Sequence, residues 1–281
     1  MIYRHKVLCV IAASLLGACA AGVGLAAARE WGVLERAEAS ALVIARVRID
    51  RPSPQSMVFM NRANQSEVFL DAQVLDLYRA AVPIPRGPLL MGCFILEADR
   101  ATSPILKKVG STAVVFLTLG PGWWAPVDGG FLDDNETTQI KINQLVVSHD
   151  NLARAEPAVV STPEQEALVR RLLQDVRDRS VDEWRRQIGA IRAAGAGVVT
   201  ALIAALSDRH QIRCGLIPIQ GGYEMFWQQP RVVADVASYV LQEMAGENFF
   251  NSHDGIRAGC FDAEERAWRI YAQYAARRPG R

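Results

Sequence analysis

Lysine is scarce in this chain of 281 residues, and neither half of the chain carries a surplus of more than one positive charge. Residues 29–160 contain 13 basic and 15 acidic side chains, and residues 161–281 contain 16 basic and 15 acidic ones. Proteins that bind nucleic acid neutralise phosphates with clustered cations. We therefore expect that nucleic acid is not a partner.

Motifs that carry chemistry are lacking as well. The chain has four histidines, and none stands three or four residues from another, as the ligands of a metal site on a helix do. The patterns C-x-x-C, G-x-S-x-G, H-E-x-x-H and G-x-G-x-x-G do not occur. We therefore expect neither a metal nor a cofactor. Half of the residues are hydrophobic and 22% are charged, which is typical of a globular chain.

The first 28 residues have the order of an export signal, with basic side chains at 4–6, an apolar run at 7–16 and small residues after it. Three outcomes are open: a lipoprotein signal, ordinary cleavage after Ala26-Ala27-Ala28, or an uncut span. Residues 7–28 hold no charge and are about long enough to cross a bilayer. Each outcome predicts export to the periplasm or the cell envelope, with membrane contact through this segment only.

One short motif favours the first of these outcomes. Leu16-Gly17-Ala18-Cys19 resembles the bacterial lipobox, in which a lipoprotein signal peptidase cuts before the cysteine and that cysteine carries the lipid. Gly17 and Ala18 stand in the reverse of the commonest order. The resemblance implies that Cys19 is the lipidated N-terminus of the mature protein.

Three cysteines remain beyond the export segment, and an exported chain meets an oxidising compartment. Cys93 stands in an apolar run, which is typical of a buried structural thiol. Cys214 and Cys260 flank loop-like stretches of the same half. We therefore expect a disulfide between Cys214 and Cys260, and three buried thiols are the alternative.

Residues 39–150 have the pattern of a β domain. Short apolar or alternating runs are separated by Gly and Pro, which predicts a small β-barrel or a sandwich. The acidic cluster between Asp128 and Glu136 is expected to be a solvated turn. The expected strands are 40–49, 68–78, 89–96, 112–119 and 139–148.

A Val-x-Val pattern followed by Gly87, Gly110-Ser-Thr-Ala-Val-Val-Phe-Leu, Trp124-Ala-Pro-Val and Gly130 resembles the OB-like β-barrel modules of exported bacterial proteins. The resemblance covers the β region alone. It implies a small closed barrel, and no site residue is carried over from it.

Residues 161–281 have the pattern of helices. Thr162, Pro163 and Gln165 form a capping box with proline at the first helical position, and Gly195-Ala196-Gly197 predicts a break between two helices. Together the two regions predict an α+β fold, with a β-barrel or sandwich followed by an all-α domain. The expected helices are 163–177, 181–194, 198–206, 231–245 and 262–276.

Ile191-Arg-Ala-Ala-Gly195, followed by Val199-Thr-Ala-Leu-Ile203-Ala-Ala-Leu206-Ser-Asp208, resembles a HEAT-like repeat. The helices at 233–241 and around Trp268 resemble the units that follow. The family's role implies a protein-binding scaffold. This chain has only about two repeat pairs and a long insertion at 209–230, whereas solenoids need three or more repeats. The domain is therefore either a short solenoid capped by the β region or a compact bundle.

Aromatic side chains stand beside a Gly-Pro-Gly turn and in the long insertion. They either fold back onto a core or form a recognition surface. The residues of the expected binding surface are Trp123, Trp124, Tyr223, Phe226 and Trp227.

These features favour a non-catalytic exported protein that binds another envelope protein, as a scaffold or adaptor. Two alternatives are open. A periplasmic hydrolase would use His210 or His253 with nearby carboxylates in a pocket. A module that binds cell wall or sugar would use Trp123 and Trp124. Otherwise, all the histidines, His149 included, are expected on the surface or satisfied in a core.

Overall fold

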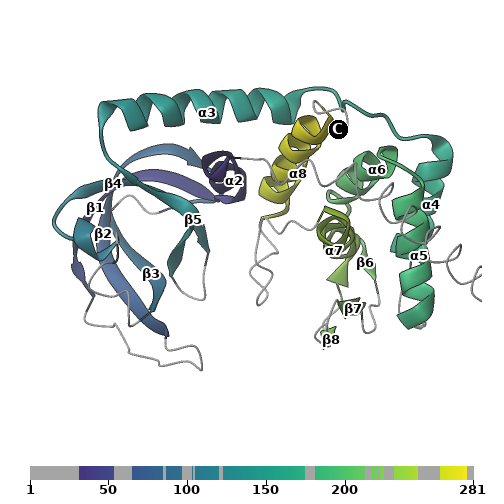
Figure 1. Cartoon of the computed structure of the whole chain (residues 1–281), viewed down its shortest axis with the longest axis horizontal. Coiled ribbons are helices and arrows are strands. Elements are labelled where there is room, and N and C mark those ends of the chain that lie inside the picture. The colour runs from purple at the N-terminus through teal and green to yellow at the C-terminus, as the bar shows by residue number, and fades with distance from the viewer. Residues whose placement is uncertain are drawn as a thin grey trace, which may run out of the picture. The chain divides into compact units, whose positions relative to one another are not determined.

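The computed structural model describes residues 32–53, 65–84, 87–96, 103, 105–119, 123–174, 181–212, 217–219, 222–224, 231–245 and 260–276. These residues form a mixed α+β fold, with a five-stranded sheet in the N-terminal half and helices after it (Figure 1), as the sequence predicts. They divide into two compact units. We call residues 32–154 with 260–267 the β unit, and residues 155–245 with 268–276 the helical unit.

Five strands make the sheet of the β unit, and each pairs with two others. They lie in the order β1-β2-β3-β5-β4, and β4 pairs back with β1, so the pairing forms a closed ring. All pairs are antiparallel except β3 with β5. The sequence predicts the first four strands and misses the fifth. The strands are β1 Val43–Pro52, β2 Gln65–Ala80, β3 Pro88–Leu96, β4 Thr112–Leu119 and β5 Trp124–Asp133.

Strand β4 is buried on both of its faces, as its unbroken apolar run indicates. On one face, Val114 and Phe116 pack with Ile44 of β1. Two helices of the β unit cover this face, α2 (Val33–Ser40) and α3 (Glu136–Arg154). Their side chains in this core cluster are Ala37, Ile142 and Val146.

The predicted strand at 139–148 is wrong, because these residues lie inside α3. β-branched residues in this stretch favour a strand locally. Packing against the sheet selects the helix instead, because the buried positions repeat every three or four residues, which is the period of a helix face. These positions are Ile142, Val146, His149 and Leu152.

The predicted solvated turn between Asp128 and Glu136 is also wrong. Strand β5 runs through Asp133, and α3 begins at Glu136. Gly129 has a φ of 71°, and a Cβ at Gly130 would stand 2.5 Å from the Cβ of Phe116. Glycines at these two positions let β5 bend closely over β4. The acidic residues of this stretch therefore lie in β5, between β5 and α3, and at the start of α3.

The helical unit confirms two local predictions. The Gln165 backbone N–H donates to Thr162 Oγ1, and the Thr162 backbone N–H donates to Gln165 Oε1, so the capping box is present. Gly195 has a φ of 91° in the predicted break. The elements are α4 Pro163–Leu173, α5 Val181–Ala193, α6 Gly197–Ala205, β6 Gln211–Ile212, β7 Ile217–Ile219, β8 Gly222–Glu224, β9 Arg231–Val232 and α7 Val233–Ala245.

The last helix, α8 (Phe261–Ala276), contributes residues to both units, with the division after Ala267. Trp268 and Tyr271, which the sequence places on one face, are both buried, and their ring centroids are 5.4 Å apart. Aromatic side chains of this size bury more apolar surface than any others. These two residues of α8 are therefore part of the core of the helical unit.

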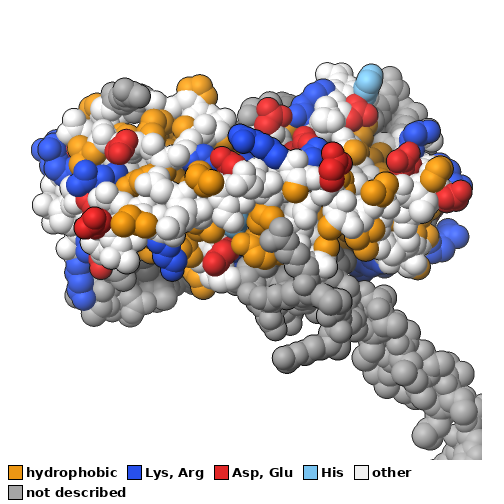
Figure 2. All heavy atoms as spheres, turned by 90° about the horizontal axis from the view of Figure 1, so that it is seen from above, with side chains coloured by type: hydrophobic (Ala, Val, Ile, Leu, Met, Phe, Trp, Pro, Cys, Tyr) orange, Lys and Arg blue, Asp and Glu red, His pale blue; other side chains and the backbone are white. Residues whose placement is uncertain are grey.

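The surface shown in Figure 2 carries Lys and Arg side chains interspersed with Asp and Glu. This mixture agrees with the near balance of charge in each half of the sequence. Within the described ranges, no helix is both long and apolar enough to cross a membrane. The predicted lipid attachment at Cys19 lies outside the described residues.

Candidate functional site

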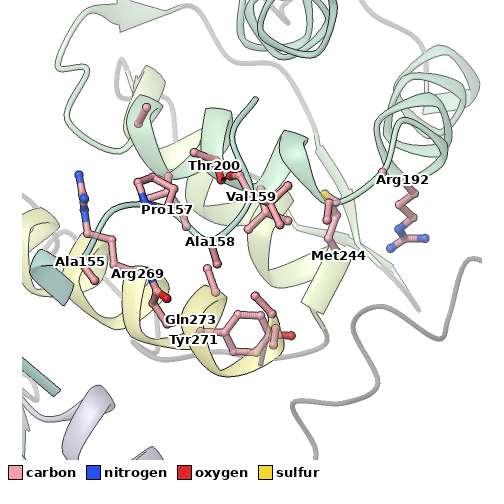
Figure 3. A pocket seen from close by; sticks show the side chains of 18 of the residues that line it. Ala155, Pro157, Ala158, Val159, Arg192, Thr200, Met244, Arg269, Tyr271 and Gln273 are labelled. Carbon is pink, nitrogen blue, oxygen red and sulfur yellow. Dashed lines mark hydrogen bonds between the residues drawn. The ribbon is translucent and has the colours of Figure 1, made fainter. Parts of the chain in front are cut away.

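The helical unit contains an apolar cavity of about 590 Å³, which we call the α6 cavity. Figure 3 shows the side chains of segment 155–159, α6 and α8 turned around it, with Met244 of α7 at its edge. Most of the lining side chains are alanine or valine. A volume of this size with an apolar lining is typical of a binding pocket.

One wall of the α6 cavity is a segment without regular structure, and side chains hold its backbone in place. Thr200 Oγ1 donates to the Val159 carbonyl at 2.6 Å, and Ser161 Oγ donates to the Gly197 carbonyl at 2.7 Å. At the other end, Gln273 Nε2 of α8 donates to the Glu156 carbonyl at 2.7 Å. Two of these bonds satisfy loop carbonyls that would otherwise be left to water, and the bond from Ser161 ties the loop to the start of α6. The segment is therefore fixed to α6 and α8.

The floor of the cavity depends on the capping residue of α4. Gln165 Nε2 donates to the Ala194 carbonyl at 2.7 Å, so one side chain both caps α4 and holds the end of α5. A Cβ at Gly197 would collide with Gln165 Oε1. A side chain at the start of α6 would therefore displace the Gln165 amide from its capping position.

Two arginines supply the charge of the α6 cavity. Arg269 and Arg192 line it, and no carboxylate, histidine or cysteine is among its lining residues. Arg192 Nη2 also donates to the Glu243 carbonyl at 2.6 Å. The lining can thus bind an apolar group with an anion beside it, and the hydroxyl groups among its lining residues are those of Thr200 and Tyr271.

A second and larger cavity, of about 870 Å³, adjoins the first along α6. It shares Thr200 and Ala204 with the α6 cavity. Val159 lines the first cavity and Val160 lines the second, and their relative exposures are 40% and 77%. Apolar surface therefore continues from one cavity to the other.

The predicted aromatic surface is only partly described. Trp123 and Trp124 are half-buried in the β unit. Trp123 packs edge-on against Phe69 with ring centroids 5.1 Å apart, and a Cβ at Gly92 would stand 2.5 Å from the Trp123 ring. Trp123 is thus a packing residue on β2 and β3. Tyr223 lies in β8 of the helical unit, and Phe226 and Trp227 lie outside the described residues.

The histidines do not reach either cavity in the part of the chain that is described. His149 is fully buried, and its Nδ1–H donates to Glu38. His210 is exposed, with Nδ1 at 2.6 Å from Asp208 Oδ1. His253 lies outside the described residues. His149 is therefore satisfied in a core. Asp208, the partner of His210, lines the second cavity of the helical unit, so the hydrolase alternative stays a prediction.

A buried charge cluster around Glu38 was not visible in the sequence. The carboxylate has no exposed surface, and it pairs with Arg266 at 2.8 Å and with Arg79 at 3.2 Å. Arg266 also pairs with Asp150 at 2.8 Å. The cluster joins α2, β2, α3 and the first part of α8 within the β unit. The one sequence signal is a lone acid inside the small and apolar run Ala37-Glu38-Ala39-Ser40-Ala41.

The environment of Glu38 favours its charged form. Burial raises the pKa of Glu38, but the hydrogen bond from His149 and the charges of Arg79 and Arg266 outweigh burial and hold the pKa below its ordinary value. Burial lowers the pKa of Arg79 to about 10. Both groups therefore stay ionised near neutral pH, and the cluster is a buried ion network.

The cysteine predictions are tested only in part. Cys260 is buried at the start of α8, and Cys214 lies outside the described residues, so the disulfide stays a prediction. Cys93 is half-buried, and its thiol donates to the Val68 carbonyl at 3.7 Å. No group of three metal-ligating side chains occurs among the described residues.

The α6 cavity was not identified from the sequence, because its lining comes from four separate segments and alanine is the commonest residue in it. The only sequence signal is the small-residue stretch Ala193–Gly197. Comparison of the chain with protein-family models, with curated proteins and with solved structures finds no match. Any function must therefore be inferred from the chain's own residues, and the α6 cavity is the strongest candidate site that they form.

Proposed function

We propose that this chain is a non-catalytic exported envelope protein that binds another protein through the α6 cavity. The observation that carries the proposal is the cavity itself, an apolar pocket with a wall held by three side-chain hydrogen bonds. Its lining residues include no aspartate, glutamate, histidine or cysteine. The apolar surface at Val159 and Val160 extends it toward solvent, as protein-binding sites do.

The proposal assigns a supporting role to the β unit, as an OB-like barrel. Its strand order, with β3 parallel to β5 and β4 paired back to β1, supports this assignment. In the same way, α5, the turn at Gly195 and α6 have the helix-turn-helix order of a HEAT-like repeat. A scaffold of that kind binds proteins along helix surfaces.

Export rests on the N-terminal sequence alone. A basic start, an apolar run and Cys19 after Leu16-Gly17-Ala18 support a lipoprotein at the cell envelope. The partner is then another protein of the envelope. Lipid at Cys19 would keep both units near the membrane surface.

The test compares capture by two variants of the mature protein. Ala204 is exposed and lines both cavities, so Ala204→Trp would obstruct both from the surface of α6 without entering the core. Ala190→Trp is the matched control, because Ala190 is exposed on α5 and lines neither cavity. We expect the wild type and Ala190→Trp to capture the same envelope protein and Ala204→Trp to lose it. Capture that survives in Ala204→Trp would contradict the proposal, provided that circular dichroism shows all three proteins folded.

A further inference from the structure

The two arginines of the α6 cavity define the chemistry of its occupant. Figure 3 shows Arg269 toward one end of the cavity and Arg192 toward the other, with Val159 and Tyr271 between them. The lining contains no aspartate or glutamate. Because cations lie at both ends of the apolar α6 cavity, the cavity complements a ligand that is apolar in its middle and acidic at both ends.

The pairing of Arg192 leaves room for such a ligand. One of its amino groups donates to the Glu243 carbonyl, and the Glu243 carboxylate stands 3.8 Å away. Glu243 does not line the cavity. A guanidinium has five N–H donors in a fixed fork, so Arg192 can hold Glu243 and still donate to an anion in the cavity.

The surface outside the cavity indicates a polypeptide and not a small lipid. Exposed Val159 and Val160 continue the apolar surface to the second cavity, across Thr200. A fatty acid has one charged end, so it would satisfy one arginine and leave these valines uncovered. A peptide segment would cover the valines and reach both arginines.

We propose that the α6 cavity binds an apolar peptide segment of another protein with acidic residues on both flanks. This inference rests on the proposed function and names the chemistry of its partner. Apolar side chains of the segment fill the cavity, and the two flanking carboxylates pair with Arg192 and Arg269. The acidic flanks then select among apolar segments, because a basic flank would meet a like charge.

Binding of three synthetic peptides by the mature protein, measured by fluorescence anisotropy, tests the inference. The first has a core of leucine and alanine with glutamates on both flanks, the second has the same core with lysines, and the third has glutamates around a serine-glycine core. We expect the first to bind about tenfold more tightly than the second at low salt, with a preference that falls as salt rises. We expect the third not to bind.

Charge-reversed variants provide the control. In the double variant Arg192→Glu with Arg269→Glu, the preference should reverse toward the lysine-flanked peptide. Arg185→Glu with Arg186→Glu makes the same change of charge at exposed positions of α5 outside the cavity, and should keep the original preference. Ala204→Trp should abolish binding of both apolar peptides, whereas Ala190→Trp should not.

Several results would overturn the inference. Equal binding of the glutamate- and lysine-flanked peptides would do so, as would binding of none of them. Displacement of the bound peptide by oleate at lower concentration than by unlabelled peptide would assign the cavity to a lipid. Tighter binding of a peptide of residues 7–28 would assign it to the chain's own segment. If the peptides bind without a charge preference while capture of the envelope protein is still lost in Ala204→Trp, the inference about acidic flanks is wrong and the proposed function is retained.

Discussion

The guanidinium of Arg266 donates to both carboxylate oxygens of Glu38, a residue 228 positions earlier in the chain. The two N–O distances are 3.2 and 2.8 Å. Bidentate pairs of this kind are the strongest side-chain ion pairs. Because Glu38 has no exposed surface, the pair connects the start of α8 to α2 inside the β unit, where water cannot replace Arg266 as a partner of the carboxylate.

Removal of the Glu38 charge should destabilise the protein strongly. Glu38→Gln leaves the buried Arg79 without its anion and leaves Arg266 with Asp150 alone, and loss of one partner of a buried ion pair costs about 3–5 kcal/mol of unfolding free energy. Urea unfolding followed by circular dichroism measures the change. Glu35→Gln on the same helix is the control, and it should cost less than about 1 kcal/mol. Equal effects of the two variants would contradict a buried network.

The same carboxylate should make stability depend on acid pH. The pKa of Glu38 in the folded protein lies below its ordinary value of 4.5, so the unfolded chain binds the proton more readily. The contribution of Glu38 is therefore complete above pH 4.5 and is lost as pH falls through the lower, folded pKa. Unfolding free energies of wild type and Glu38→Gln, measured between about pH 3 and pH 7, should converge on the acid side. A constant difference would contradict the assignment.

Two glycines of neighbouring helices should respond to alanine in opposite directions. Gly197→Ala places a methyl group against Gln165 Oε1 and disturbs the cap of α4, with an expected loss of about 0.5–2 kcal/mol. Gly189→Ala in α5 meets nothing within 4 Å and should gain about 0.5–1 kcal/mol, because glycine is a poor helix former. Thermal unfolding measures both. Gln165→Ala should cost less in the Gly197→Ala variant than in the wild type, since the cap is already disturbed there.

Trp123 should behave as a packing residue. Its edge-on contact with Phe69 and its place over Gly92 predict that Trp123→Ala lowers the unfolding free energy by about 1–3 kcal/mol. Binding to peptidoglycan, measured by co-sedimentation, should not differ between this variant and the wild type. Unchanged stability combined with lost co-sedimentation would instead favour the alternative of a sugar-binding module.

The mature N-terminus should carry lipid at Cys19. Mass spectrometry of the protein purified from membranes of the expressing cell should show a first residue Cys19 with added acyl mass. Cys19→Ala should release the protein from the membrane fraction or block its processing. An unmodified N-terminus at Arg29 would exclude lipidation and support ordinary signal cleavage.

The local part of the fold could be predicted because near neighbours in the sequence determine it. The capping box at Thr162 and Gln165 involves residues three positions apart, so it can be recognised in the sequence. The strand at 112–119 can be recognised from its unbroken apolar run alone. Strand β5 and helix α3 could not be predicted in this way. Their local preferences favour a turn and a strand, and contact with Phe116 and the rest of the sheet outweighs those preferences.

The sequence by itself determined the α+β class, four strands, the helix caps and the expectation of export, since each depends on composition or short-range periodicity. Only the tertiary structure decided that Glu38 meets Arg266 and that segment 155–161 lies against α6 to form the α6 cavity. The physical reason is that burial of a charge and closure of a cavity depend on partners far away in the chain. A local sequence pattern does not identify the distant residue that a given side chain contacts in the folded protein.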